Sequence, residues 1–324
     1  VSDTEIEINA TTIDINGAIA MDGAITGATN ITLSGELDAA TLDISGNADI
    51  DGTLEADAYT IEGTSFIKLG GTDFSNSLLV GHSTTGTLDA AEKNTGVGIG
   101  AMNSITTGDN NVALGYGALE DATQGYDNVA LGAQAIRNVT TGITNIGIGR
   151  SSGYSLTGGA RNIAIGYSSL LSGTADDNIA IGYQSSRYNA SGTMNVSLGK
   201  NALEGVSSNN HSYNTALGSL SNEAITTGGY NVTVGYQSGD NLTSGSGNII
   251  IGTADAGSAT GSHQLKIAGY DGSSTVTWID GDSSGNVTFP AEIDGATLDI
   301  SGNADIDGTT NLDAVDIDGA VQID

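Results

Sequence analysis

The sequence contains no cysteine, a single proline and a single tryptophan, and only 5% of its 324 residues are aromatic. The absence of cysteine excludes disulfide frameworks, cysteine-based zinc sites and thiol catalysis. The shortage of large side chains argues against a broad globular core and favours a narrow one filled by small and β-branched residues. The chain is instead rich in glycine, with 49 residues of this type.

Basic residues are also scarce: the chain has eight Lys and Arg residues and 38 acidic residues, which gives a formal net charge of −30. A surface of this charge repels phosphate backbones and anionic lipids, so we expect no nucleic-acid partner. No apolar run approaches the roughly 20 residues that a membrane helix requires, so no membrane insertion is expected either. All eight basic residues lie between 68 and 266, whereas residues 1–66 and 269–324 carry 13 and 12 acidic residues and no base.

A repeat of about 17 residues dominates the middle of the chain. It is marked by glycines at intervals of 17 residues with two exceptions, 16 and 19: Gly81, Gly98, Gly115, Gly132, Gly149, Gly166, Gly182, Gly199, Gly218, Gly235 and Gly252. Four positions before each of the last ten stands an asparagine: Asn94, Asn111, Asn128, Asn145, Asn162, Asn178, Asn195, Asn214, Asn231 and Asn248. A fixed period of this length predicts a solenoid in which each repeat forms one coil. We expect the asparagines to form an internal ladder, each satisfying backbone groups at a turn and stacking on its neighbour.

Each repeat carries a short alternating segment such as Val112-Ala113-Leu114, with large apolar residues on either side of a small one. Period-two alternation predicts a β-strand with a large-residue face and a small-residue face. Seventeen residues suffice for two short strands and two turns per coil. Such a flat roll encloses little core, so we expect its small-residue face to pack against identical chains in a closed ring.

Both ends of the chain share a different pattern. Residues 40–53 recur without change at 296–309, within segments of short alternating strands that end in glycine. The sequence therefore predicts four parts: an acidic β shaft (1–66), the repeat array (67–256), a β collar (257–292) and a second acidic shaft (293–324) that stops in mid-pattern, as an excerpt of a longer polypeptide would. In the collar we expect strands around His263–Ile267, Thr275–Ile279 and Asn286–Phe289.

The Asn-x-Ala-Ile/Leu-Gly-Tyr repeats resemble the head repeats of trimeric autotransporter adhesins and related arrays in bacteriophage tail fibres. The collar segment from Trp278 to Thr288 and the Gly-Asn-Ala-Asp-Ile-Asp-Gly shaft are similar to segments of marine-phage tail fibres. The resemblance implies an all-β homotrimer with a left-handed parallel β-roll head and triple-stranded shafts. The repeat is longer than the common adhesin repeat, and no heptad stalk is visible, which favours the phage fibre.

Tyrosines are the candidate recognition residues. Tyr116, Tyr167, Tyr183 and Tyr236 directly follow a repeat glycine, while Tyr126, Tyr213 and Tyr230 come shortly before the next asparagine. An aromatic ladder on the side of a fibre suits stacking against the sugar rings of a cell-surface glycan; the alternative is that these rings only cover the edges of the roll.

No catalytic, cofactor or metal constellation is expected. His82, His211 and His263 are far apart in sequence, and Asp43, Asn47, Asp49 and Asp51 alternate with apolar residues as the outer face of a strand does, although oxygen ligands of this kind also suit calcium. We therefore predict a non-enzymatic structural protein, namely an extracellular phage tail-fibre segment that acts as a spacer and contacts a host glycan or protein. The alternatives are a bacterial trimeric surface adhesin and, less favoured, a fibre-borne glycan depolymerase, which needs paired carboxylates in a groove.

Overall fold

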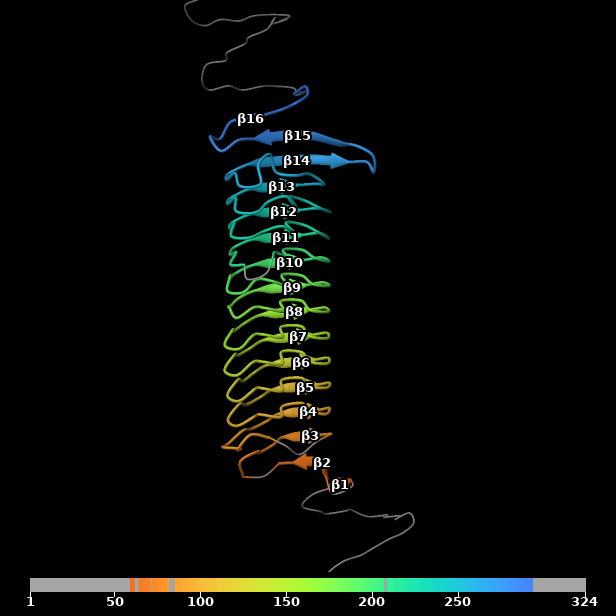
Figure 1. Ribbon diagram of the computed structural model, residues 1–324, viewed down its shortest axis with the longest axis vertical. Helices are drawn as coiled ribbons and strands as arrows, with labels where there is room; N and C mark the ends of the chain where they lie inside the picture. The colour runs from red at the N-terminus through yellow and green to blue at the C-terminus, as the bar shows by residue number, and fades with distance from the viewer. Residues whose placement is uncertain (1–58, 62–63, 71, 82–84, 207–208, 294–324) are drawn as a thin grey trace, which may run out of the picture. The chain divides into compact units, whose positions relative to one another are not determined.

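The computed structural model describes residues 59–61, 64–70, 72–81, 85–206 and 209–293. These residues form a β-solenoid in which sixteen strands make one continuous sheet in sequence order (Figure 1). No helix occurs in the described part of the chain, so none that could span a membrane is found there. Apart from residues 59–61, 64–66 and 293, the two predicted acidic shafts lie outside the described residues, and so do their repeated segment and the candidate calcium ligands Asp43 to Asp51.

The array contributes parallel strands of three residues each, one per coil. They are β3 (Leu78–Val80), β4 (Thr95–Val97), β5 (Val112–Leu114), β6 (Val129–Leu131), β7 (Ile146–Ile148), β8 (Ile163–Ile165), β9 (Ile179–Ile181), β10 (Val196–Leu198), β11 (Thr215–Leu217), β12 (Val232–Val234) and β13 (Ile249–Ile251). Equivalent residues pair from coil to coil, as in Val112 with Val129 and Leu114 with Leu131. The sequence repeat is thus the structural coil, and the solenoid has about 11 turns.

Antiparallel strands flank this stack. Before it, β1 (Tyr59–Ile61) pairs with β2 (Thr64–Leu69), which pairs with β3. After it, β14 (Leu265–Tyr270) continues the parallel ladder from β13, and the chain then reverses into β15 (Thr275–Gly281) and β16 (Val287–Thr288). The three predicted collar strands are confirmed.

The expectation of two strands per coil was wrong. The segment opposite each strand consists of turns whose backbone groups bond to the next coil, as in the Leu119 N–H donating to the Ala135 carbonyl. Residues with left-handed backbone interrupt any extended run there; Gln134 and Ile136, for example, have φ of 59° and 45°. An alternation of left-handed and right-handed residues turns the chain sharply and keeps the coil short.

The two faces of the strand are the reverse of those predicted. Ala113, Ala130 and their equivalents point into the coil and are fully buried, whereas the flanking large residues point outward, and Leu114 is 52% exposed. The interior is so narrow that each small residue meets a long side chain from the opposite wall: a Cβ added at Gly147 would collide with Ile136 Cγ1. Small residues are therefore required inside the coil, and each chain encloses a core of its own.

The repeat glycines stack on one another along the array. Gly132 has a φ of 134°, and a Cβ added to it would lie 2.8 Å from the carbonyl carbon and oxygen of Gly149. Only glycine tolerates both this backbone conformation and this approach. The same relation joins the other repeat glycines, so the period in the sequence records a backbone contact.

The asparagine ladder is confirmed. The Asn128 Oδ1 accepts hydrogen bonds from both the backbone N–H and the Nδ2 of Asn145, while the Asn128 Nδ2 donates to the Gly142 carbonyl at 2.9 Å. Each of these asparagines is fully buried, or nearly so. The ladder satisfies backbone groups that burial would otherwise leave unpaired, and its amides are committed to structure.

The core changes character along the array. One hydrophobic cluster runs from Phe74 to Ala180, and smaller ones follow around Leu203 and Leu242. Between and beside these clusters the interior is polar, and Ser185 and Ser197 are hydrogen-bonded to each other there. The other buried polar residues of this stretch are Ser186, Asn189, Asn209, His211, Ser221, Asn222 and Thr233. This polar stretch coincides with the 19-residue repeat.

Candidate binding surface

The four predicted tyrosines lie at the corner of the coil that follows the strand. We call the residues directly after the repeat glycines the corner strip: Ile99, Tyr116, Ala133, Arg150, Tyr167, Tyr183, Lys200, Ser219, Tyr236 and Thr253. Backbone bonds hold the strip in register, since the Ser168 N–H donates to the Arg150 carbonyl and the Gln184 N–H to that of Tyr167. Equivalent positions are therefore neighbours along the solenoid.

The structure brings only two of these four tyrosines together. The rings of Tyr167 and Tyr183 stack with centroids 5.4 Å apart and an angle of 12° between their planes, and both remain exposed. Tyr116 and Tyr236 are each separated from this pair by two coils that have no tyrosine at the strip position. The Arg150 guanidinium lies 5.9 Å from the Tyr167 ring centroid, so the faces of Tyr167 are occupied by Arg150 and Tyr183. A ligand at this ring meets its edge and hydroxyl group.

A second aromatic pair lies on the turn before the strand. Tyr213 and Tyr230 stack at 4.6 Å and 4°, and Tyr126 is exposed on an earlier coil. Tyr213 and Tyr230 have left-handed backbone, with φ of 61° and 59°. The stacking stabilises neighbouring coils and leaves the ring edges open to solvent.

The outward side of the sheet is the largest apolar feature of the array, and sequence reasoning assigned it to the wrong side of the strand. We call it the outer face; it consists of the first and third residue of each strand. Its most exposed large apolar residues are Val112, Leu114, Ile148, Leu198, Val232, Ile249 and Ile251. The face continues into the collar, because Leu265 and Ile267 pair with Ile249 and Ile251. Trp278 packs over Gly269 beside it and is 57% exposed.

The histidines do not converge. His82 lies outside the described residues, His263 is exposed, and His211 is buried with neither ring nitrogen hydrogen-bonded. His211 occupies the position where most coils have glycine, three residues before the ladder asparagine, and burial lowers its pKa to about 4. No group of three potential metal-ligating residues is found in the described part of the chain.

Two carboxylates do come together where the array meets the collar, a pair that sequence reasoning missed. Asp240 and Asp255 lie on successive coils and line a cavity of about 440 Å³ with Lys266 and three threonines. Burial, followed by the hydrogen bond to Asp255, raises the pKa of Asp240 to about 6. The two carboxyl groups are hydrogen-bonded to each other, whereas the two catalytic carboxyl groups of a glycoside hydrolase stand about 5 Å or more apart. This pair therefore does not support the depolymerase alternative.

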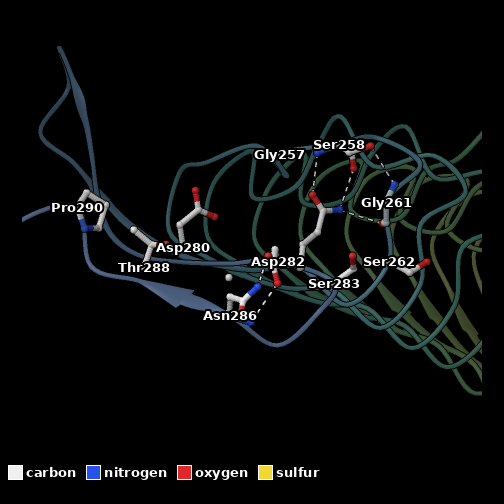
Figure 2. Close-up of a pocket in the computed structure, with 12 residues that line it drawn as sticks. Gly257, Ser258, Gly261, Ser262, Asp280, Asp282, Ser283, Asn286, Thr288 and Pro290 are labelled. Carbon is white, nitrogen blue, oxygen red and sulfur yellow. Dashed lines mark hydrogen bonds between the residues drawn. The ribbon is translucent and has the colours of Figure 1, made fainter. Parts of the chain in front are cut away.

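A second cavity of about 460 Å³ lies between the 257–264 loop and strands β15 and β16 (Figure 2). Its wall includes Gln264, which replaces the ladder asparagine and donates from Nε2 to the Asn248 Oδ1. The Asp282 carboxylate accepts hydrogen bonds from the Ser284 and Asn286 backbone and from the Asn286 side chain. These contacts, with the Asn286 side chain foremost, lower the pKa of Asp282, so the carboxylate is engaged in closing a turn.

Comparison with known proteins adds no relative: no protein-family model, curated protein or solved structure matches this chain. The structure shows a β-solenoid repeat protein, and no match assigns it to phage tail fibres or to adhesins.

Proposed function

We propose that this chain is a structural segment of an extracellular fibre, of the phage tail-fibre kind, which assembles as a homotrimer through its outer face and contacts host-cell surfaces through its corners. The observation that carries the proposal is the outer face itself: an apolar stripe of Val, Leu and Ile that runs along every coil and remains partly exposed in the single chain.

The size of this face favours assembly over simple exposure. Full burial of a Val, Leu or Ile side chain contributes about 1.5–3 kcal/mol, so completing the burial of one that is already half covered contributes about 1 kcal/mol. With about two such side chains on each of about 11 turns, the gain is on the order of 20 kcal/mol per chain. This exceeds the cost of association, roughly 4–15 kcal/mol.

The three-fold arrangement comes from the resemblance to fibre and adhesin heads, and light scattering tests it directly. The proposal predicts a particle of three times the 32.3 kDa chain mass. Replacing Leu114, Ile148 and Leu198 with lysine should dissociate it, whereas lysine at Thr107, Thr141 and Ser191, which are exposed in turns, should not. A wild-type monomer or dimer would contradict the trimer.

Recognition is tested separately with the fluorescently labelled full chain on a panel of bacterial cells. Binding to at least one strain supports the adhesive role, and alanine at Tyr167 and Tyr183 should reduce it. Alanine at Tyr270, an exposed tyrosine in β14 that is outside the corner strip and not among the candidate recognition residues, is the control. Absence of binding across the panel would leave a spacer without a receptor-binding role.

A further inference from the structure

The corner strip differs from the rest of this acidic chain in its charge. None of its ten residues, from Ile99 to Thr253, is acidic, and neither is any residue directly after them: Gly100, Gly117, Gln134, Ser151, Ser168, Gln184, Asn201, Leu220, Gln237 and Ala254. Along the edge that is nearer to the strands, the corner strip borders the apolar outer face. The strip thus carries only neutral and basic side chains, within a region (67–268) that holds 13 of the 38 acidic residues and all eight basic ones.

Two cations in this strip have no acidic partner. Arg137, Arg161 and Arg187 are all held in ion pairs, with Glu120, with Asp176 and Asp177, and with Glu204. Arg150 and Lys200 are exposed and form no ion pair with any residue that the structure describes. Because no acidic side chain of the described residues pairs with them, these two charges are available to an external anion.

The two cations flank the stacked tyrosines. Along the strip the order is Arg150, Tyr167, Tyr183, Lys200, one residue per coil, which places the charges three coils or about 14 Å apart at a strand spacing of about 4.8 Å. Asp255 stands three positions after Gly252. In four coils an acidic residue stands five positions after the repeat glycine, as Glu120 and Glu204 do. In the coils of Arg150, Tyr167 and Tyr183 that position holds Tyr154, Leu171 and Arg187.

We propose that the stretch from Arg150 to Lys200 binds a linear acidic polysaccharide, with the chain of the glycan running along the solenoid axis. This inference rests on the proposed adhesive function and specifies its ligand class. Carboxylate or sulfate groups of the glycan pair with Arg150 and Lys200, while sugar hydroxyl groups and C–H edges meet the exposed edges and hydroxyl groups of Tyr167 and Tyr183. The linear strip, with one side chain per coil, favours a repeating extended ligand.

Binding of the full chain to polygalacturonate tests the proposal, with dextran as the neutral polysaccharide and polyglutamate as an anionic peptide. Wild type should bind polygalacturonate, more weakly as salt is raised, and should not bind dextran. The double variant Arg150→Gln/Lys200→Gln should weaken binding about tenfold. That change corresponds to about 1.4 kcal/mol, which two exposed ion pairs can supply together.

The matched control is Lys93→Gln/Arg161→Gln, which removes the same charge from two exposed residues whose partners are acidic side chains of this chain. It should change the affinity less than twofold. Equal losses in the two double variants would mean that only net charge matters and would overturn the site. Equal or tighter binding of polyglutamate would overturn the polysaccharide as ligand, and a changed oligomeric state of the strip variant would make the strip an interface between copies instead.

Failure of this inference differs from failure of the proposed function. If the chain binds cells and the Arg150→Gln/Lys200→Gln variant binds them equally well, the adhesive function stands and the acidic-glycan site is wrong. If the wild-type chain binds no cells, the adhesive function itself fails.

Discussion

Replacement of Gly132 by alanine tests whether the repeat glycines form the backbone contact described above. The added Cβ would lie 2.8 Å from the carbonyl carbon and oxygen of Gly149, whereas ordinary contacts begin at 3.4 Å. The two coils must therefore separate locally by about 0.6 Å, the difference between these distances. The carbonyl in question also accepts hydrogen bonds from Ser152 Oγ and N–H, so the displacement strains a second contact.

The expected cost has two parts. A non-glycine residue forced into a sparsely populated backbone region costs about 1–3 kcal/mol, and Gly132 has a φ of 134°. Overpacking against a backbone that cannot rotate away costs about another 1–3 kcal/mol. Gly132→Ala should therefore destabilise each chain by roughly 2–6 kcal/mol, since both terms act at one position.

Gly158→Ala is the control in the same array. A Cβ added at Gly158 would meet only Thr141 Oγ1 at 3.5 Å, and Gly158 is not in the left-handed region. This variant should be neutral or stabilised by up to about 1 kcal/mol through the unfolded state.

Repeat arrays unfold in segments, so hydrogen exchange in β6 and β7 should accompany thermal unfolding. Faster exchange in Gly132→Ala, confined to coils near residue 132, is expected. Equal exchange and equal melting temperatures in the two variants would refute the assigned role.

Three further predictions concern buried polar groups. Asn145→Ala should destabilise the array by about 2–5 kcal/mol in thermal unfolding, because it leaves buried backbone groups of adjacent coils unpaired, whereas Asn138→Ala, outside the ladder, should have little effect. Burial lowers the pKa of His211 to about 4, so on acidification the unfolded chain takes up the proton before the folded chain does. The free energy of unfolding should therefore fall as the pH drops from about 6.5 to 4. His211→Gly should flatten this pH dependence, and an unchanged slope would contradict the assignment to His211. The pKa of Asp240 is raised to about 6, so its effect on stability has the opposite sign to that of His211, and stability falls as the pH rises through 6. Asp240→Asn should stabilise the protein at pH 7, by less than about 1 kcal/mol after solvent screening. The variant should lose this advantage at pH 4.

The coil could be predicted from the sequence because residues one repeat apart lie next to each other on successive coils. Residues one repeat apart are neighbours, so the asparagine ladder and the glycine stack follow from their positions alone. The same reasoning could have found the ion pair between Glu120 and Arg137, which are 17 residues apart and 2.6 Å from each other. The position they share, five residues after the repeat glycine, varies in residue type from coil to coil, so the repeat pattern alone does not mark it.

The orientation of the strand could not be read in the same way. Alternation in Val112-Ala113-Leu114 separates two faces but does not say which one is enclosed. That depends on the opposite wall of the coil, where Leu119 and its equivalents project inward and leave room only for a small residue. The repeat frame shows that His211 stands at a position where most coils have glycine, but it does not show that the imidazole is buried.

The solenoid divides its tasks around the circumference of the coil. The inward positions are held by asparagine amides, stacked glycines and tightly fitted Ala–Leu contacts, so a change there disturbs two coils at once. The outward positions at the corner are kept in register by backbone hydrogen bonds, and the corner strip accordingly contains Ile, Tyr, Ala, Arg, Lys, Ser and Thr without loss of register. Because the scaffold does not depend on these side chains, charge and aromatic character can be arranged there for a ligand. In the coils from Gly149 to Lys200 this freedom is used to place two cations that have no ion pair among the described residues, Arg150 and Lys200, on either side of two stacked tyrosines.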